Sequence, residues 1–273
     1  MFSNWTHLMR SFTEKSLNKS TSNNLMDTKI PFNPMPFASF TNRCTVSNKR
    51  PNNGFTVTGN DPLHTQQLLQ DLKSHFAIKH ISLFLGIQIN RTNAGFFLTQ
   101  GHYASKILQE TGMSNCKAAP TPITPASKHA TIDSNPFPDA YLYRCLAGSL
   151  QYLSITLPDI AFATNQVCQH MQSPTDHDFQ NLKRILLYVK GTITHGLPII
   201  PGDTTLHTFT DADWASDLTD RKSISGFCTF MGSNLLSWSV KKQITVAKSS
   251  TEAEYRALSA ATTDNLWLRR LAD

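Results

Sequence analysis

The alternation of apolar and polar positions predicts a group of strands in the last third of the chain. Residues 206–213 alternate with period two, which places the acidic positions on one face of a strand and hydroxyl side chains on the other. Two further strand-like runs, 223–232 and 234–243, are joined by a short turn around Gly232. This pattern predicts an antiparallel meander, followed by an Ala/Leu-rich helix that begins after the hydroxyl side chains at 249–251.

Four other stretches carry apolar residues at helical spacing. Pro158 suits the first turn of one predicted helix, where its missing N–H is not needed. Thr175 and Asp176 are expected to cap the start of another. Gly191 and Gly196 are expected to end that same helix. The predicted helices cover residues 64–76, 141–157, 158–172 and 175–192.

A β-hairpin is predicted between the first two of these helices. Its strands are residues 83–89 and 95–100, and its turn lies at 90–94. We expect the apolar side chains of the first strand, Leu83, Leu85 and Ile87, to serve structural packing.

Two stretches lack such periodicity. Residues 1–53 are rich in Asn, Ser, Thr and Pro, and we expect most of them to be disordered. Residues 115–140 contain five of the fourteen prolines and are predicted to form an extended linker.

The composition narrows the class of protein. A length of 273 residues suits one large or two small domains, and no apolar run is long enough to predict a membrane span. Five scattered cysteines, without a CxxC pair or a secretory leader, indicate reduced thiols in an intracellular protein of undetermined compartment. The first twenty residues share the composition of an organelle transit peptide, and the alternative is a leader unrelated to the rest of the chain.

The net charge of +6 is unevenly distributed. Residues 1–53 hold seven Lys/Arg against two acidic residues, which gives +5 and leaves only +1 for the remainder. The remainder therefore lacks the strong overall positive charge of many nucleic-acid-binding domains. Contact with nucleic acid would have to come from a local group of cations.

Acidic residues at the predicted strand end and helix start are candidates for a divalent metal site. Asp211 lies near the end of the strand at 206–213, and one glutamate near the helix start could approach it. Glu252 and Glu254 are separated by about 200° around a helix, so they cannot both face one ion. The alternative is a solvated acidic surface whose charges interact with the helix dipole. The spacing alone leaves both interpretations open.

Several motifs in register resemble one known family. TDADWASD, DRKSISGFCTFMG, LLSWSVKKQITVAKSSTEAEYRAL and NLWLRRL are similar, in order and spacing, to the start of the ribonuclease H domain in Pol polyproteins of copia-type long-terminal-repeat retrotransposons. The resemblance implies that Asp211 and Glu254 correspond to Mg²⁺ ligands. It also implies two-metal hydrolysis of the RNA strand of an RNA–DNA hybrid, with no small-molecule substrate.

The resemblance extends upstream to Gly54. The stretch from FTVTGND to TPITP is similar to the segment after the polymerase active site of copia-type reverse transcriptases, in which the hairpin would be the primer grip. LAGSLQYL and PDIAFATNQVCQHMQSPTDHDFQNLKRILLYVKGT resemble the thumb and connection, which grip the template–primer duplex. Lys183, Arg184 and Lys190 would then contact phosphates, and the alternative is an ordinary solvated helix face. Three histidines without ligand spacing are not expected to bind metal: His170, His177 and His195.

The chain also departs from the family pattern. The family's other two metal-binding aspartates follow this helix, whereas Asp264 lies within the helix and Asp273 at its end. No two aspartates are adjacent anywhere, so the polymerase YVDD-like pair is missing. We therefore expect a catalytically inactive fragment of an RNA-directed DNA polymerase and ribonuclease H. The alternative is a residual or domesticated module that binds nucleic acid or protein.

The expected architecture is α+β: a reverse-transcriptase palm and thumb remnant with a helical connection, then a truncated ribonuclease H-like mixed sheet with one helix. The predicted segments are a leader at 1–53, a palm remnant at 54–114, a linker at 115–140, a helical thumb and connection at 141–200, and a truncated ribonuclease H-like domain at 201–273.

Overall fold

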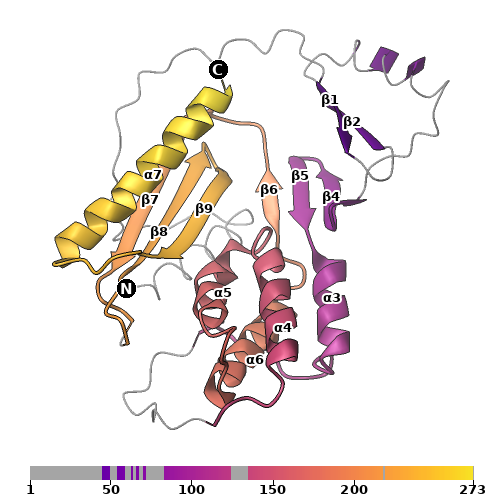
Figure 1. The fold of residues 1–273 in the computed structure, drawn as a ribbon. Coiled ribbons are helices and arrows are strands. Elements are labelled where there is room, and N and C mark those ends of the chain that lie inside the picture. Colours follow the sequence, from indigo (N-terminus) through magenta and orange to yellow (C-terminus); the bar gives the residue numbers. More distant parts are fainter. Residues whose placement is uncertain are drawn as a thin grey trace. The chain divides into compact units, whose positions relative to one another are not determined.

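The computed structural model describes residues 45–49, 54–58, 63, 66–67, 70–71, 83–123, 135–217 and 219–272. It combines helices with antiparallel sheets (Figure 1), so the expected α+β class is confirmed. The strands are β1 (Thr45–Lys49), β2 (Gly54–Thr58), β3 (Leu83–Phe84), β4 (Ile87–Thr92), β5 (Gly95–Thr99), β6 (Leu197–Ile199), β7 (Leu206–Asp213), β8 (Ile224–Met231) and β9 (Asn234–Lys242). The helices are α3 (Gly101–Glu110), α4 (Ala140–Leu153), the 3-10 turn η1 (Pro158–Ile160), α5 (Ala161–Cys168), α6 (Asp176–Gly191) and α7 (Ser250–Ala272).

The chain divides into two compact units. One contains residues 31–81 and 266–273, and within it β1 pairs with β2 in an antiparallel ladder. Of residues 1–53, which are predicted to be mostly disordered, the structure describes the five of β1. The rest of that range lies outside the described residues. In the predicted helix 64–76, the described residues 66–67 and 70–71 are helical, and the others are not described.

The second unit contains a four-stranded antiparallel sheet of order β3-β4-β5-β6. The predicted hairpin is present, but its first strand is interrupted. Leu85 and Gly86 have positive φ angles of 49° and 72° and form a tight turn between β3 and β4. The prediction that Leu85 serves structural packing is wrong, because its position in this turn leaves it 63% exposed. Gly196 allows β6 to approach β5, because a Cβ there would lie 2.2 Å from the Leu98 carbonyl oxygen.

Helices α3 to α6 enclose the larger hydrophobic core. Its fully buried members include Leu150, Leu182 and Tyr188. The start of α6 is fixed by a capping box, in which the Thr175 side chain accepts from the Asp178 amide and Asp178 accepts from the Thr175 amide. The predicted helix 158–172 instead begins as η1 and ends at Cys168.

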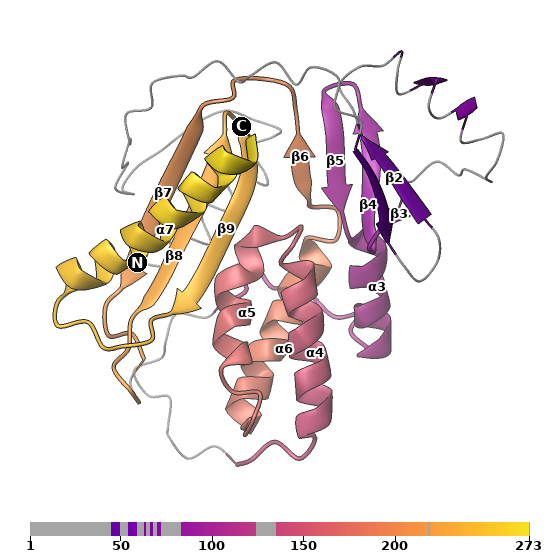
Figure 2. The same cartoon turned by 45° about the horizontal axis from the view of Figure 1, so that its top comes forward.

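The meander predicted near the C-terminal end is confirmed as the antiparallel sheet β7-β8-β9. Its two faces have different neighbours. Helix α7 runs across one face (Figure 2), where Asn265 donates to the Thr208 hydroxyl at 2.9 Å. The other face packs Phe209 and Trp238 against Phe162 of α5. Each face of this sheet is therefore covered by a helix.

Side-chain hydrogen bonds attach this sheet to the neighbouring elements of the same unit. Asn234 accepts from the Ile200 amide and donates to the Ile200 carbonyl, both at 2.8 Å. Trp238 Nε1 donates to the Ser154 carbonyl at 3.2 Å, and Asn165 donates to the Val240 carbonyl at 3.1 Å. Strand β9 is thus held at its first residue, near its centre and close to its last residue.

Alanines bring α7 close to the sheet. Ala253, Ala257 and Ala261, spaced by one helical turn, are 0%, 1% and 2% exposed. Ala253 and Ala257 form a small apolar cluster with Ala212 of β7 and Ala247. Such small side chains let the helix backbone approach the strand more closely than leucine or phenylalanine would.

We predict that Ala257→Leu lowers the free energy of unfolding by about 1–3 kcal/mol, because the added methylenes have no space between helix and sheet. Ala260→Leu is the matched control, since Ala260 is exposed on the same helix. Urea titration of both variants measures the difference. Equal stability of the two would contradict the close packing described for α7.

A buried carboxyl lies within the helical core. Asp159 is 0% exposed and accepts a hydrogen bond of 2.5 Å from the Tyr188 hydroxyl. Burial raises the pKa of Asp159, and the Tyr188 bond and the nearby His195 only partly oppose this. The protonated acid is therefore favoured more strongly in the folded chain than in the unfolded one.

We predict that Asp159→Asn becomes more stable relative to the parent chain as the pH rises from 4 to 7. The folded-state pKa of Asp159 lies above its unfolded value of about 3.9, so the protonated side chain stabilises the fold at low pH. This contribution is lost as the pH rises through the folded-state pKa. Asparagine keeps an acceptor for Tyr188 but does not titrate. Urea titrations at several pH values give the difference, and a difference independent of pH would refute this role of Asp159.

Candidate functional site

The two carboxylates predicted to bind metal come from β7 and from the first turns of α7. Asp211 and Asp213 are alternate residues on the same half-buried face of β7. Glu254 reaches the edge of that strand, where its Oε1 accepts from the Ala212 amide at 3.3 Å. The fold therefore places both Asp211 and Glu254 beside the Ala212 amide.

The carboxylates influence one another electrostatically. Burial raises the pKa of Glu254, and the negative charge of Asp211 raises it further, while the Ala212 amide acts in the opposite direction. Burial likewise raises the pKa of Asp211; the Ala212 amide lowers it, and the charge of Asp213 adds to the increase. Burial is thus the largest cause of both shifts, and the charge of a neighbouring carboxylate adds to each of them.

The other acidic residues of α7 lie elsewhere. Glu252 is engaged by Arg256 at 2.6 Å and by the Lys248 amide at 2.7 Å, on a different side of the helix from Glu254. Asp264 is ten residues beyond Glu254 in the same helix, or about 15 Å along its axis. Asp273 lies outside the described residues.

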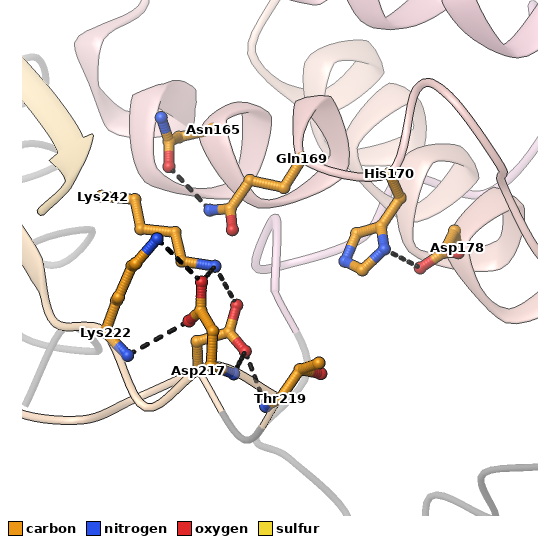
Figure 3. Close-up of polar contacts among 9 residues, drawn as sticks. Asn165, Gln169, His170, Asp178, Asp217, Thr219, Lys222 and Lys242 are labelled. Carbon is orange, nitrogen blue, oxygen red and sulfur yellow. Dashed lines mark hydrogen bonds and ion pairs between the residues drawn. The ribbon is translucent and has the colours of Figure 1, made fainter. Parts of the chain in front are cut away.

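The loop after β7 is closed by a network of ion pairs. Lys242 of β9 bonds Asp217 and also lies 3.0 Å from Asp220, which is 3.4 Å from Lys222 (Figure 3). Trp214 Nε1 donates to the Ala247 carbonyl at 3.0 Å and so joins the loop to the segment before α7. These contacts fix both chain segments that carry the candidate carboxylates.

The described residues do not form a complete two-ion site. In the described part of the chain, no group of three or more His, Cys, Asp or Glu side chains could hold a metal ion. A pair of ions needs bridging and flanking carboxylates on both sides of the reacting phosphate. Asp211 and Glu254 supply two oxygen-bearing side chains, which at most suits one ion completed by water.

The predicted nucleic-acid-binding cations lie on α6. Arg184 and Lys190 face an extended stretch, residues 116–121, which we call the strap. Arg184 Nη2 donates to the Thr121 hydroxyl at 2.9 Å, and Lys190 Nζ donates to the Cys116 carbonyl. Lys183 is the neighbour of Arg184 on the same helix. Two of the three cations are thus bound to the strap.

Among the described residues, the histidines belong to no group of three or more His, Cys, Asp or Glu side chains that could hold a metal ion. His170 Nδ1 lies 3.8 Å from Asp178 Oδ1 (Figure 3). His195, which follows the end of α6 in the sequence, lies near the buried Asp159. Among the described helices, none is both long and apolar enough to cross a membrane.

Sequence reasoning did not identify two groups that shape the site. One is the backbone amide of Ala212, which no side-chain pattern reveals. The other is the row of Ala253, Ala257 and Ala261, whose four-residue spacing in the sequence would have predicted a closely packed helix face. Gln243 was also missed: its amide donates to the Ser225 hydroxyl at 2.7 Å and the Ala253 carbonyl at 3.0 Å.

Comparison with known proteins identifies several relatives. An uncharacterized mitochondrial protein of Arabidopsis thaliana is 44% identical over 215 residues, covering 77% of this chain and 89% of the relative. The retrovirus-related Pol polyprotein from transposon RE1 of the same plant is 40% identical over 216 residues, covering 78% of this chain. The corresponding polyprotein from transposon TNT 1-94 of Nicotiana tabacum is 31% identical over 226 residues.

The chain spans only 15% of the RE1 polyprotein and 17% of the TNT 1-94 polyprotein. No family model matches the sequence, and no solved structure matches it. The identity nevertheless extends over more than three quarters of this chain in each of these three relatives. The chain therefore belongs to the family of retrovirus-related Pol polyproteins of copia-type retrotransposons.

Proposed function

We propose that this 273-residue polypeptide is a segment of an RNA-directed DNA polymerase and ribonuclease H polyprotein, and that by itself it is catalytically inactive. In this proposal β4 and β5 derive from the polymerase palm, and α4 to α6 from its thumb and connection. The sheet β7-β8-β9 with α7 derives from the first part of a ribonuclease H-like domain. The family relationship and the order of these elements support the assignment.

The proposal of inactivity is carried by the carboxylates. Asp211 and Glu254 approach one amide, and within the described residues no third ligand joins them. The sequence also has no adjacent aspartate pair with which to align a primer hydroxyl and a nucleoside triphosphate. In this proposal the polypeptide lacks part of the metal-ligand set for DNA polymerisation and part of the set for hydrolysis of the RNA strand.

The partner in this proposal is an RNA–DNA hybrid or a template–primer duplex. Support comes from the cations of α6, which lie in a stretch that contains no acidic residue between 179 and 191. Because the strap engages Arg184 and Lys190, Lys183 is the cation that the proposal places first in contact with a phosphate.

We predict that the purified chain does not cleave the RNA strand of a labelled RNA–DNA hybrid with either Mg²⁺ or Mn²⁺. An active ribonuclease H provides the positive control. Asp211→Asn and Asp213→Asn are matched variants, since each removes one charge from the same face of β7. Cleavage that Asp211→Asn abolishes and Asp213→Asn retains would overturn the proposal, whereas cleavage equal in all three samples identifies a contaminant.

A further inference from the structure

A group of positive charges lies where the strap crosses helix α6. The strap contributes Lys117, and residues 179–191 contribute Lys183, Arg184 and Lys190. Neither segment contains an aspartate or a glutamate. A concentration of cations without acids is a favourable environment for a phosphate group.

Arg184 has unused hydrogen-bonding capacity at this point. Its Nη2 donates to the Thr121 hydroxyl at 2.9 Å, whereas its Nε is buried and has no hydrogen-bond partner. No carboxylate in the described ranges forms an ion pair with it. Nη2 and Nε lie on one edge of the guanidinium, the edge that binds two oxygens of a single phosphate.

The strap is held along one side of α6 by contacts spaced along the helix. The Ala119 amide donates to the Leu187 carbonyl at 3.1 Å, between the Arg184 and Lys190 contacts. Gly191 leaves room for the strap, because a Cβ there would lie 3.2 Å from the Ala118 Cβ. Thr121 is exposed, and its hydroxyl donates to the Ile123 carbonyl at 2.9 Å. The Thr121 hydroxyl is therefore both accessible and directly beside a guanidinium.

We propose that Thr121 is a phosphorylation site and that its phosphate binds the Nη2 and Nε edge of Arg184, fastening the strap to α6. Thr121 precedes Pro122, the dipeptide that proline-directed protein kinases recognise. The inference is independent of the proposed function, since it concerns only the strap and α6.

The chemistry is a phosphoryl transfer from ATP in the active site of the kinase. The Thr121 oxygen attacks the γ-phosphorus, the bond from that phosphorus to the β-phosphate oxygen breaks, ADP leaves, and the hydroxyl proton passes to a base of the kinase. Pro122 is buried, so the kinase acts on the strap while it is lifted from α6. When the strap returns, it carries a charge of about −1.5 to −2 beside Arg184.

An external phosphate, such as that of a nucleic acid, is the less favoured ligand for Arg184. The strap already engages both Arg184 and Lys190, so a nucleic acid would have to displace it. A phosphate carried by Thr121 itself needs no such displacement, because its bridging oxygen is already within hydrogen-bond distance of Nη2.

The test begins with the full chain carrying Thr124→Ala, which removes the neighbouring Thr-Pro dipeptide. After incubation with a purified proline-directed kinase and MgATP, peptide mass spectrometry is expected to find phosphate on Thr121. In ³¹P NMR titrations, the second pKa of this phosphate should be lower by about 1 pH unit in the folded chain than in the urea-unfolded chain. An unmodified Thr121, or equal pKa values in the two states, would refute the proposal.

Matched variants of α6 separate a specific contact from a general positive potential. Arg184→Gln should abolish the pKa difference, Arg184→Lys should retain part of it, and Lys183→Gln, which removes the same charge one residue away, should retain most of it. Equal losses in Lys183→Gln and Arg184→Gln would contradict the proposal and indicate a diffuse cationic surface of the kind that binds nucleic acid. If a variant does not fold, the proposal is still tested by the chain without a substitution in α6, in which the second pKa of the phosphate is compared between the folded and the unfolded state.

Discussion

The close approach of helix α7 to strand β7 determines the geometry of the candidate site. Helix and sheet meet through alanine side chains, and this short separation allows Glu254 to reach the Ala212 amide at the strand edge. A larger side chain in this layer would move the helix outward and separate Glu254 from Asp211. The position of Glu254 thus depends on the small size of the side chains between α7 and β7.

The acidic residues near this interface are of two kinds. In the ion-pair network, burial acts to raise the pKa of Asp217, but the bond from Lys242 and the backbone amides of Thr219 and Asp220 outweigh it, so the pKa is lowered. For Asp211 and Glu254 the shift is in the opposite direction, because burial raises the pKa of both carboxyls and outweighs the effect of the Ala212 amide. Ion pairs and backbone amides thus lower the pKa of the acid that holds the loop, whereas burial raises the pKa of the two candidate carboxyls.

Period-two and helical patterns were sufficient to predict the meander β7-β8-β9 and the helices α4, α6 and α7, but they left open whether a glutamate approaches Asp211. They did not predict α3 or the short strand β6, which depends on a partner almost a hundred residues away: Leu98 lies opposite Leu197 in the register. They also did not predict that Leu85 occupies a turn, since a positive φ is unusual for leucine. The contacts of Arg184 and Lys190 were inaccessible to sequence reasoning, because an extended segment without periodicity supplies their partners.

The central proposal is that Asp211 and Glu254 are two ligands of an incomplete metal site. Isothermal titration of the purified chain with Mg²⁺ and Mn²⁺, with Asp211→Asn as the reference, tests this most directly. The account predicts at most one weakly bound ion in the parent chain, lost in Asp211→Asn. Two tightly bound ions per chain, both dependent on Asp211, would contradict it.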